Sequence, residues 1–397
     1  MDLLIKPGKL NGTIDAIPSK SQAHRILICA ALADKITEVI CPATSQDIDA
    51  TVSCLNALGA DIQKTDYGYK AIPISKPPQN AVLNCGESGS TLRFLLPVAG
   101  ALGVDTTFVL QGRLPQRPLS PLWEELERMG CRLSRPTENT VRCQGKLRSG
   151  LYTIDGSVSS QYITGLLFAM TILGKSQLKI TGNVQSKPYI DQTRQVLALF
   201  GAAFENEFVT AQFPQISPGR ITVEGDWSNG AFFLTAAKLG SDIFVNGLDI
   251  SSTQGDKVIT GLLDMLNENC TIDVAQIPDL LPILCVAAAA LKGATFTTIE
   301  RLRIKESDRI ASTAAMLNGM GIKTEISKTK MTVFPGAFTG GQIDACNDHR
   351  IAMCAAIAST IATGNIIIKG AQCVSKSYPG FWEDFRKLGG NYEQYLR

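Results

Sequence analysis

Basic residues recur along the sequence beside serine, glycine and proline, in segments typical of turns and helix starts. They are Lys20, Arg25, Arg113, Arg117, Lys305, Arg309, Arg350 and Lys376. A guanidinium group binds phosphate or carboxylate through a planar fork, and an ammonium group acts as a mobile point charge. Each residue alone is typical of a surface cation. Their recurrence at helix starts instead predicts a shared site for small molecules that carry phosphate and carboxylate groups.

Two carboxylates in the second half of the chain are candidates for proton transfer. Asp279 follows a proline and opens an apolar run that contains no other charge before Lys292. Glu306 lies between Lys305 and Arg309. A carboxylate at the head of a buried helix can have a pKa tuned for acid–base work. The alternatives are that Asp279 only caps a helix and that Glu306 only forms an ion pair within one.

Motifs for metals and nucleotides are absent from the sequence. The two histidines, His24 and His349, each precede an arginine and form no HxH or HExxH pattern, and no two cysteines form CxxC. There is no GxxxxGK[ST] loop and no GxGxxG, and the glycines of 86–90 do not bracket a serine as GxSxG requires. We therefore expect neither a metal nor a cofactor.

The composition narrows the class of protein. The chain has 397 residues, 45% hydrophobic and 19% charged, with a net charge of +2, which suits a folded protein of two or three domains but not a nucleic-acid binder. Residues 1–7 lack an apolar signal region, and the apolar run 280–291 is too short to cross a bilayer. The eleven cysteines lie mostly in apolar runs, so we expect buried, reduced thiols. These features predict a cytoplasmic protein without a membrane partner. We also expect a monomer.

Six segments share one pattern, a polar turn-like start followed by an apolar run, and the starts lie about 53 to 70 residues apart. The apolar runs are 25–32, 92–102, 162–173, 231–239, 280–291 and 351–362. A helix that is apolar all round is buried inside its domain. The free N–H groups and the dipole at its N-terminus favour anions. Six such starts, several with Lys or Arg, predict that the basic residues are gathered around helix N-termini.

A second series of amphipathic helices alternates with the first. These helices span 51–60, 122–130, 193–201, 258–269, 311–321 and 381–390, and they end at glycine or asparagine, which suit the left-handed position after a helix. Short β-branched runs such as 107–110 and 365–368 predict strands between the helices. Each unit therefore carries two helices and several strands, which predicts an α/β protein.

The order of five motifs resembles the EPSP synthase (3-phosphoshikimate 1-carboxyvinyltransferase) family from Lys6 to Trp382. The motifs are PSKS at 18–21, GSVSSQY at 156–162, SKPYID at 186–191, KESDR at 305–309 and NDHRIAM at 347–353. The resemblance implies a two-domain inverse α/β barrel with six βαβαββ repeats, three per domain. Domain 1 would comprise residues 1–19 and 225–397, and domain 2 residues 20–224. The active site would lie in the cleft between the domains.

The resemblance also implies an activity and its residues. The enzyme would transfer the enolpyruvyl group of phosphoenolpyruvate to the 5-hydroxyl of shikimate 3-phosphate through a tetrahedral intermediate, with phosphate released. Asp279 would act as base, and Glu306, with Lys20 or Lys376, would move the enol proton. Shikimate 3-phosphate would contact Lys20, Ser21, Arg25, Ser159, Ser160, Gln161, Ser186, Tyr189, Asp279 and Lys305. Phosphoenolpyruvate would contact Lys20, Gly89, Arg117, Gln161, Arg309, Arg350 and Lys376.

Three residues depart from the family pattern. Arg301 stands where members often have asparagine, Glu87 replaces an asparagine, and Phe94 stands where many have proline. Glu87 and Phe94 flank Gly89, in the loop that the resemblance assigns to phosphoenolpyruvate and to the inhibitor glyphosate. The response to glyphosate is therefore open, although Gly89 keeps the space at this position.

Two other functions compete with this one. UDP-N-acetylglucosamine enolpyruvyl transferases share the fold but carry a cysteine in the loop that corresponds to 112–119, and this chain has none there. A non-catalytic anion-binding protein would need the cations but neither Asp279 nor Glu306, so substitution of these two carboxylates separates it from an enzyme.

Overall fold

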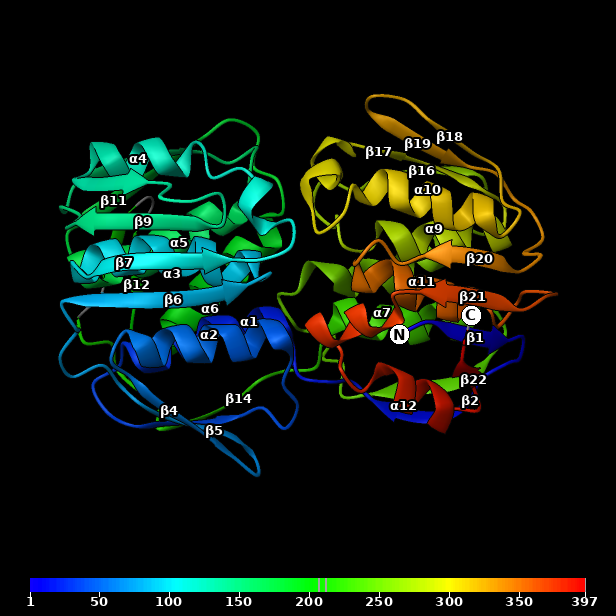
Figure 1. Cartoon of the computed structure of the whole chain (residues 1–397), viewed down its shortest axis with the longest axis horizontal. Coiled ribbons are helices and arrows are strands. Elements are labelled where there is room, and N and C mark those ends of the chain that lie inside the picture. Colours follow the sequence, from blue (N-terminus) through cyan, green and yellow to red (C-terminus); the bar gives the residue numbers. More distant parts are fainter. Residues whose placement is uncertain (206–207, 211–212, 397) are drawn as a thin grey trace. The chain divides into compact units, whose positions relative to one another are not determined.

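The computed structural model describes residues 1–205, 208–210 and 213–396 (Figure 1). The chain folds into two compact units, unit 1 (Met1–Ile17 and Glu224–Arg397) and unit 2 (Pro18–Val223). It passes from one unit to the other at residues 17–18 and again at 223–224. These crossings lie next to the sequence-based boundaries after residues 19 and 224.

Unit 2 contains three four-stranded sheets with one shared topology. Their strand orders are β14-β3-β5-β4, β6-β7-β9-β8 and β10-β11-β13-β12. The strands are β3 (Thr37–Ile40), β4 (Asp61–Thr65), β5 (Gly68–Ile72), β6 (Asn80–Gly86), β7 (Asp105–Leu110), β8 (Cys131–Ser134), β9 (Thr140–Gly145), β10 (Leu151–Asp155), β11 (Ser176–Thr181), β12 (Ala203–Glu205), β13 (Phe208–Thr210) and β14 (Arg220–Thr222). In each sheet a central strand pairs in parallel with one neighbour and antiparallel with a hairpin, as β3 does with β14 and β5.

Unit 1 repeats this topology twice and departs from it once. Its sheets have the orders β20-β21-β1-β22, β16-β17-β19-β18 and β15-β2. The strands are β1 (Leu3–Lys6), β2 (Asn11–Asp15), β15 (Asp242–Asn246), β16 (Cys270–Asp273), β17 (Ala294–Thr297), β18 (Thr324–Ile326), β19 (Lys330–Val333), β20 (Gly341–Asp344), β21 (Ile366–Lys369) and β22 (Asn391–Gln394). In the first of these sheets the antiparallel pair comes from the two ends of the chain, β1 and β22, instead of a hairpin.

The apolar helices predicted from the sequence form the interior of each unit. They are α1 (Lys20–Ala31), α3 (Gly89–Leu102) and α5 (Ser160–Leu173) in unit 2, and α7 (Trp227–Lys238), α9 (Leu281–Ala290) and α11 (His349–Ala358) in unit 1. Nearly all of their residues are buried, because they are apolar on every side. Each unit has one continuous hydrophobic core around them.

Side chains cap the N-termini of five of these helices. Ser19, Ser88, Ser159, Asp226 and Asp348 accept hydrogen bonds from backbone N–H groups in the first turns of α1, α3, α5, α7 and α11. This is why polar residues precede each apolar run in the sequence. Helix α9 has no side-chain cap, because Leu280 occupies the capping position and Asp279 lies before it. The alternative that Asp279 only caps a helix is therefore wrong.

In several repeats the helix of the second series is shorter than the helix of the first series. It comprises α2 (Gln46–Ala57), α4 (Leu122–Arg128), α6 (Lys187–Leu199), α8 (Ile259–Met265), α10 (Arg309–Gly319) and α12 (Phe381–Lys387). Short 3-10 helices span Leu114–Gln116, Gly255–Val258, Glu300–Ile304 and Ala371–Lys376. Glu306 lies between the third of these and α10, so its ion pair with Arg309, three residues further on, joins the segment before the helix to the first residue of α10.

The repeat that contains α7, β15 and α8 lacks the antiparallel pair of the others. Only residues 266–269 separate α8 from β16. In other repeats, longer segments separate the second helix from the strand that corresponds to β16: 58–79, 129–150, 200–219 and 320–340. Four residues cannot form two strands and a turn. The expected fold is confirmed, but one of the six expected βαβαββ units is incomplete for this reason.

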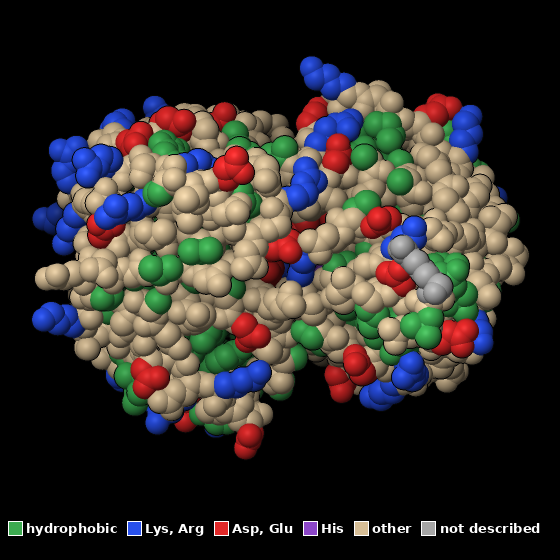
Figure 2. All heavy atoms as spheres, viewed as in Figure 1, with side chains coloured by type: hydrophobic (Ala, Val, Ile, Leu, Met, Phe, Trp, Pro, Cys, Tyr) green, Lys and Arg blue, Asp and Glu red, His purple; other side chains and the backbone are tan. Residues whose placement is uncertain are grey.

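All eleven cysteines are free thiols, and nine of them are buried, while Cys270 is partly exposed and Cys346 is exposed. This agrees with the expectation of buried, reduced thiols. On the face shown in Figure 2, the Lys and Arg side chains of each unit are interspersed with Asp and Glu.

Among the described residues, no helix has both the length and the apolar character needed to cross a membrane.

Candidate active site

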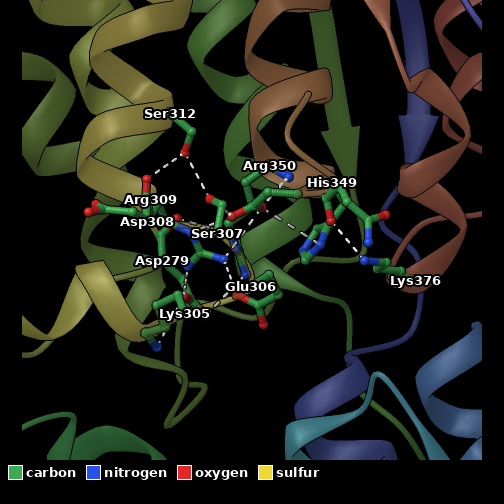
Figure 3. A network of polar contacts seen from close by, with 12 residues as sticks. Asp279, Lys305, Glu306, Ser307, Asp308, Arg309, Ser312, His349, Arg350 and Lys376 are labelled. Atoms are coloured by element: carbon green, nitrogen blue, oxygen red, sulfur yellow. Dashed lines mark hydrogen bonds and ion pairs between the residues drawn. The ribbon is translucent and has the colours of Figure 1, made fainter. Parts of the chain in front are cut away.

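Asp279 lies at the centre of a polar cluster in unit 1 (Figure 3). Its Oδ1 atom is 2.7 Å from Arg309 Nη1 and 3.6 Å from Lys305 Nζ, and its Oδ2 atom is 3.1 Å from Arg350 Nη2. Arg350 Nη1 also donates to the Asp279 carbonyl oxygen at 3.2 Å. One carboxylate thus orients three cations from two separate motifs, KESDR and NDHRIAM, and the starts of α9, α10 and α11 bring them together.

Arg309 is the most deeply buried cation of the cluster, with 1% of its surface exposed. Its Nε atom donates to Asp348 Oδ2 at 3.0 Å, and its Nη2 atom donates to Glu306. Burial by itself disfavours the charged guanidinium, but the carboxylates of Asp348, Glu306 and Asp279 together raise the pKa of Arg309 above its usual value. Arg309 is therefore a permanent, rigidly held cation.

Asp348 anchors this arrangement from inside the core. It is fully buried, caps α11 and accepts from Ser307 Oγ at 3.0 Å. Burial works to raise the pKa of Asp348, but the ion pair with Arg309 outweighs it and holds the pKa below its usual range. The carboxylate is therefore ionised, and it positions Arg309 without itself being exposed.

The two lysines of the cluster differ in environment. Burial lowers the pKa of Lys305 to about 8, against the opposing effect of Asp279. Lys305 can therefore lose its proton close to neutral pH. Lys376 donates to the carbonyl oxygen of Asn347 at 2.7 Å and is 6% exposed. Lys305 is thus held near Asp279, whereas Lys376 is held beside the residues that precede α11.

A further acid adjoins the cluster. Asp256 is buried and accepts a short hydrogen bond from Ser228. Burial first, and the charge of Asp279 second, raise the pKa of Asp256 to about 7, while Arg350 works to lower it. Asp256 was not predicted as a site residue, because its proximity to Asp279 arises only from the packing of the 3-10 helix 255–258.

In unit 2, two guanidinium groups meet at Gly89, the first residue of α3. A Cβ atom at position 89 would lie 2.4 Å from Arg93 Nη1 and 2.8 Å from Arg117 Nη1. Any side chain at position 89 would therefore displace one or both guanidinium groups. Arg117 was predicted from its motif, but Arg93 was not, although it lies four residues after Gly89 and hence on the same face of the helix. The exposed Arg113 does not join this group.

Gln161 links this pair of arginines to the neighbouring helix start. Its Oε1 atom accepts from Arg93 Nη1 at 3.0 Å, and its Nε2 atom donates to Ser90 Oγ at 3.0 Å. Helices α3 and α5 therefore present Gln161 and Gly89 side by side. These are two of the positions that the resemblance assigned to phosphoenolpyruvate.

The start of α1 supplies the remaining cations of unit 2. Lys20 Nζ lies 2.8 Å from Asp47 Oδ2, so a carboxylate that was not predicted from the sequence holds this lysine. Arg25 donates to the carbonyl oxygens of Ser21 at 2.6 Å and Tyr189 at 2.9 Å, and to Thr193 Oγ1 at 2.8 Å. Burial lowers the pKa of Arg25 to about 10. Arg25 therefore fixes the segments that carry its predicted neighbours.

The serines predicted to bind shikimate 3-phosphate lie at two helix starts. Ser159 caps α5, and Ser160 is its first residue. Ser186 precedes α6 with φ of 56°, a left-handed conformation that is uncommon outside glycine, and it accepts from the Tyr189 N–H at 3.2 Å. The predicted contacts of these residues with a ligand stay predictions, and so does the expectation that the groups of the two units share one cleft.

Two of the departures from the family pattern have structural roles. Phe94 is buried, packs edge-to-face on His24 and Phe168, and lies 5.1 Å below the Arg25 guanidinium. Arg301 lies in the 3-10 helix 300–304, where its charge helps to lower the pKa of Lys305. The third, Glu87, lies beside Gly112, since a Cβ atom there would be 2.4 Å from Glu87 Oε2.

Within the described residues, no group of three or more His, Cys, Asp or Glu side chains is arranged to hold a metal ion.

The repeated α/β units and the clusters at their helix starts define a fold found in enolpyruvyl transferases. The enolpyruvyl transferase NikO of Streptomyces tendae superposes with a TM-score of 0.75 at 16% identity over 99% of this chain and 98% of that one. The EPSP synthase of Acinetobacter baumannii superposes with a TM-score of 0.80 at 24% identity over 99% of each chain.

Sequence comparison identifies the family itself. The family described as EPSP synthase (3-phosphoshikimate 1-carboxyvinyltransferase) matches residues 4–385. A 3-phosphoshikimate 1-carboxyvinyltransferase of Clostridium kluyveri is 38% identical over 424 residues, which cover 98% of both chains. The chain belongs to the EPSP synthase family, and the resemblance seen in its motifs is thereby confirmed.

Proposed function

We propose that the chain transfers the carboxyvinyl group of phosphoenolpyruvate to the 5-hydroxyl of shikimate 3-phosphate, releasing phosphate, in aromatic amino acid biosynthesis. Membership of the EPSP synthase family supports this reaction. The observation that carries the proposal is the placement of Asp279 among Lys305, Arg309 and Arg350. It brings a base together with the cations that two anionic substrates need.

The fixed cations overcome the repulsion between the substrates. Both substrates carry phosphate and carboxylate groups, so they repel each other in water. Arg309 and Arg350 in unit 1, and Arg93 in unit 2, are held in place by hydrogen bonds to protein groups, and Arg117 lies beside Arg93 at Gly89. Cations that need no reorganisation on binding stabilise developing charge efficiently. We assign phosphoenolpyruvate to Lys20, Gly89, Arg117, Gln161, Arg309, Arg350 and Lys376, and shikimate 3-phosphate to the residues predicted from the sequence.

Proton transfer then uses the carboxylates of unit 1. Glu306, with Lys376 or Lys20, delivers a proton to the methylene carbon of phosphoenolpyruvate. Asp279 accepts the proton of the 5-hydroxyl as its oxygen bonds to the adjacent carbon, which gives a tetrahedral intermediate. The C–O bond to phosphate breaks, phosphate leaves, and a proton returns from the methyl group to the enzyme, restoring the double bond.

Phosphate release tests the proposal directly. Purified protein is mixed with phosphoenolpyruvate and shikimate 3-phosphate, and free phosphate is followed. We expect release with this pair and none with UDP-N-acetylglucosamine as acceptor. The reverse result would identify the alternative enolpyruvyl transferase, and binding of both substrates without release would identify a non-catalytic anion-binding protein.

We also expect a reducing compartment such as the cytoplasm, because all eleven cysteines are free thiols. Glyphosate is the proposed inhibitor, competing at the cations around Gly89, and its potency is measured in the same assay.

A further inference from the structure

Tyr162 is a buried polar residue beside the arginine pair of unit 2, and no role was predicted for it from the sequence. It ends the GSVSSQY motif and is the third residue of α5, with 1% of its surface exposed. Its hydroxyl group donates to the carbonyl oxygen of Pro118 at 2.6 Å. The two residues are 44 positions apart, so this bond ties α5 to the segment that joins β7 to α4.

The carbonyl group that Tyr162 binds belongs to the residue directly after Arg117. This part of the chain, residues 117–121, lies between the 3-10 helix 114–116 and α4. Two of its residues, Pro118 and Pro121, have no backbone N–H group, so the stretch has few donors of its own with which to hold its shape. A bond from α5 to the Pro118 carbonyl oxygen therefore fixes the backbone next to Arg117.

The same carbonyl oxygen also holds Arg93. Arg93 Nη2 donates to it at 3.3 Å, and the Arg93 Cζ atom lies 5.9 Å from the centroid of the Tyr162 ring. A cation over an aromatic face is attracted by the ring quadrupole. Tyr162 thus acts on both members of the arginine pair, through its hydroxyl group on the backbone beside Arg117 and through its ring on the Arg93 side chain.

The arginine pair needs such support because like charges repel. Both guanidinium groups approach one point, since a Cβ atom at Gly89 would lie 2.4 Å from Arg93 Nη1 and 2.8 Å from Arg117 Nη1. Arg93 is 3% exposed, so little water screens this repulsion. Two neutral acceptors, the Pro118 carbonyl oxygen and Gln161 Oε1, hold Arg93 and leave its charge available to an anionic ligand.

Close packing of α5 on α3 brings Tyr162 to this place. A Cβ atom at Gly165 would overlap the Arg93 carbonyl oxygen and lie 3.0 Å from Pro97 Cγ, so α5 approaches the backbone of α3 directly at this point. Tyr162 lies three residues before Gly165 and therefore on the same face of α5. The glycine thus brings the Tyr162 ring within reach of Arg93.

We propose that Tyr162 is a positioning residue for phosphoenolpyruvate: its hydroxyl group fixes the backbone beside Arg117, and its ring supports the Arg93 guanidinium. This inference rests on the proposed function, which assigns Arg117 to phosphoenolpyruvate. Tyr162 is buried, so it acts through the two arginines and not by contact with the ligand. Its loss should weaken the binding of phosphoenolpyruvate and leave shikimate 3-phosphate unaffected.

Tyr162→Phe tests the hydroxyl group, because phenylalanine keeps the ring. We expect the KM for phosphoenolpyruvate to rise roughly three- to tenfold, since one hydrogen bond to a buried carbonyl group is lost, while kcat and the KM for shikimate 3-phosphate change by less than about twofold. Tyr162→Leu removes the ring as well and should raise the KM for phosphoenolpyruvate further.

Tyr152→Phe is the matched control. Tyr152 is also buried, and its hydroxyl group donates to the carbonyl oxygen of Arg148 at 2.8 Å, away from the arginine pair. Both Tyr→Phe variants should lower the melting temperature by similar amounts, but Tyr152→Phe should leave the KM for phosphoenolpyruvate unaltered. A general loss of stability lowers the active fraction and hence the apparent kcat, whereas KM reports the position of the arginines.

An unchanged KM for phosphoenolpyruvate in Tyr162→Phe, an equal rise for both substrates, or the same rise in Tyr152→Phe would overturn the proposal. Calorimetric titration with phosphoenolpyruvate alone separates this result from a failure of the proposed reaction. If the unaltered chain released no phosphate, the proposed function would fail. Weaker binding of phosphoenolpyruvate to Tyr162→Phe than to Tyr152→Phe would still support the positioning role, and equal binding would overturn it.

Discussion

Arg350 holds Asp279 by two bonds, one to the Oδ2 atom at 3.1 Å and one to the backbone carbonyl oxygen at 3.2 Å. The two residues are 71 positions apart in the sequence and belong to different repeats. This double contact fixes both the position and the rotation of the carboxylate at the head of α9. A base that is oriented before substrate binds can accept a proton without the entropic cost of finding its geometry.

Asp279→Asn should therefore abolish most of the turnover. The amide keeps the shape of the side chain but cannot accept the hydroxyl proton, so we expect kcat to fall by roughly 100- to 10,000-fold. Binding of shikimate 3-phosphate, measured by calorimetry, should change far less. Asp273→Asn, on the exposed end of β16, is the control and should leave kcat unaltered. Equal turnover by Asp279→Asn and the unaltered chain would contradict its role as base.

Gly89→Ala should weaken the binding of phosphoenolpyruvate more than the binding of shikimate 3-phosphate. The new Cβ atom would lie within 3 Å of both Arg93 and Arg117, so one or both guanidinium groups must move. We expect KM for phosphoenolpyruvate to rise roughly tenfold, about 1.4 kcal/mol of binding free energy. Gly261→Ala is the matched control, because its Cβ atom would meet nothing within 4 Å. An unchanged KM in Gly89→Ala would show that the two arginines do not bind this substrate.

Binding of shikimate 3-phosphate should weaken as the pH rises through about 8. Lys305 has its pKa lowered to about 8 by burial, so it carries its charge below that pH and loses it above. Once Lys305 is deprotonated, affinity should fall by up to about tenfold per pH unit. Lys305→Arg should remove this dependence, because arginine stays charged in this range. Calorimetric titrations at several pH values check the prediction, and parallel curves for both proteins would contradict it.

Asp256 should make unit 1 less stable at high pH. Its pKa is raised to about 7, mainly by burial, so the folded protein keeps this proton at pH values where the unfolded chain has already released it. The free energy of unfolding therefore falls as the pH rises from about 4 to 7 and stays low above that. Asp256→Asn remains neutral, so we expect it to be more stable than the unaltered chain above pH 7, by on the order of a few kcal/mol, and equal near pH 4.

Urea unfolding at acidic and alkaline pH measures this difference. Asp249→Asn is the control of opposite sign, because hydrogen bonds from Ser251 lower the pKa of Asp249, which is exposed. Asp249→Asn should slightly lower the free energy of unfolding at alkaline pH. If Asp256→Asn showed the same stability difference from the unaltered chain at every pH, the raised pKa would be ruled out.

The sequence by itself determined the repeats, the two series of helices and most of the cations. Apolar and polar residues alternate with the period of the element that they form, and capping serines and aspartates mark helix starts, so both signals are local. The motifs around Lys20, Gln161, Arg309 and Arg350 could also be recognised from the sequence, because each is a short run of neighbouring residues.

Only the tertiary structure decided which of these residues meet and how their protons are held. Arg93 joins Arg117 at Gly89, Asp348 anchors Arg309, and Asp256 adjoins Asp279, through contacts between segments far apart in the chain. Burial and neighbouring charges set the pKa values of Lys305 and Asp256, and neither is a property of local sequence. The bond from Tyr162 to Pro118 likewise became visible only with the packing of α5, because the two residues are 44 positions apart.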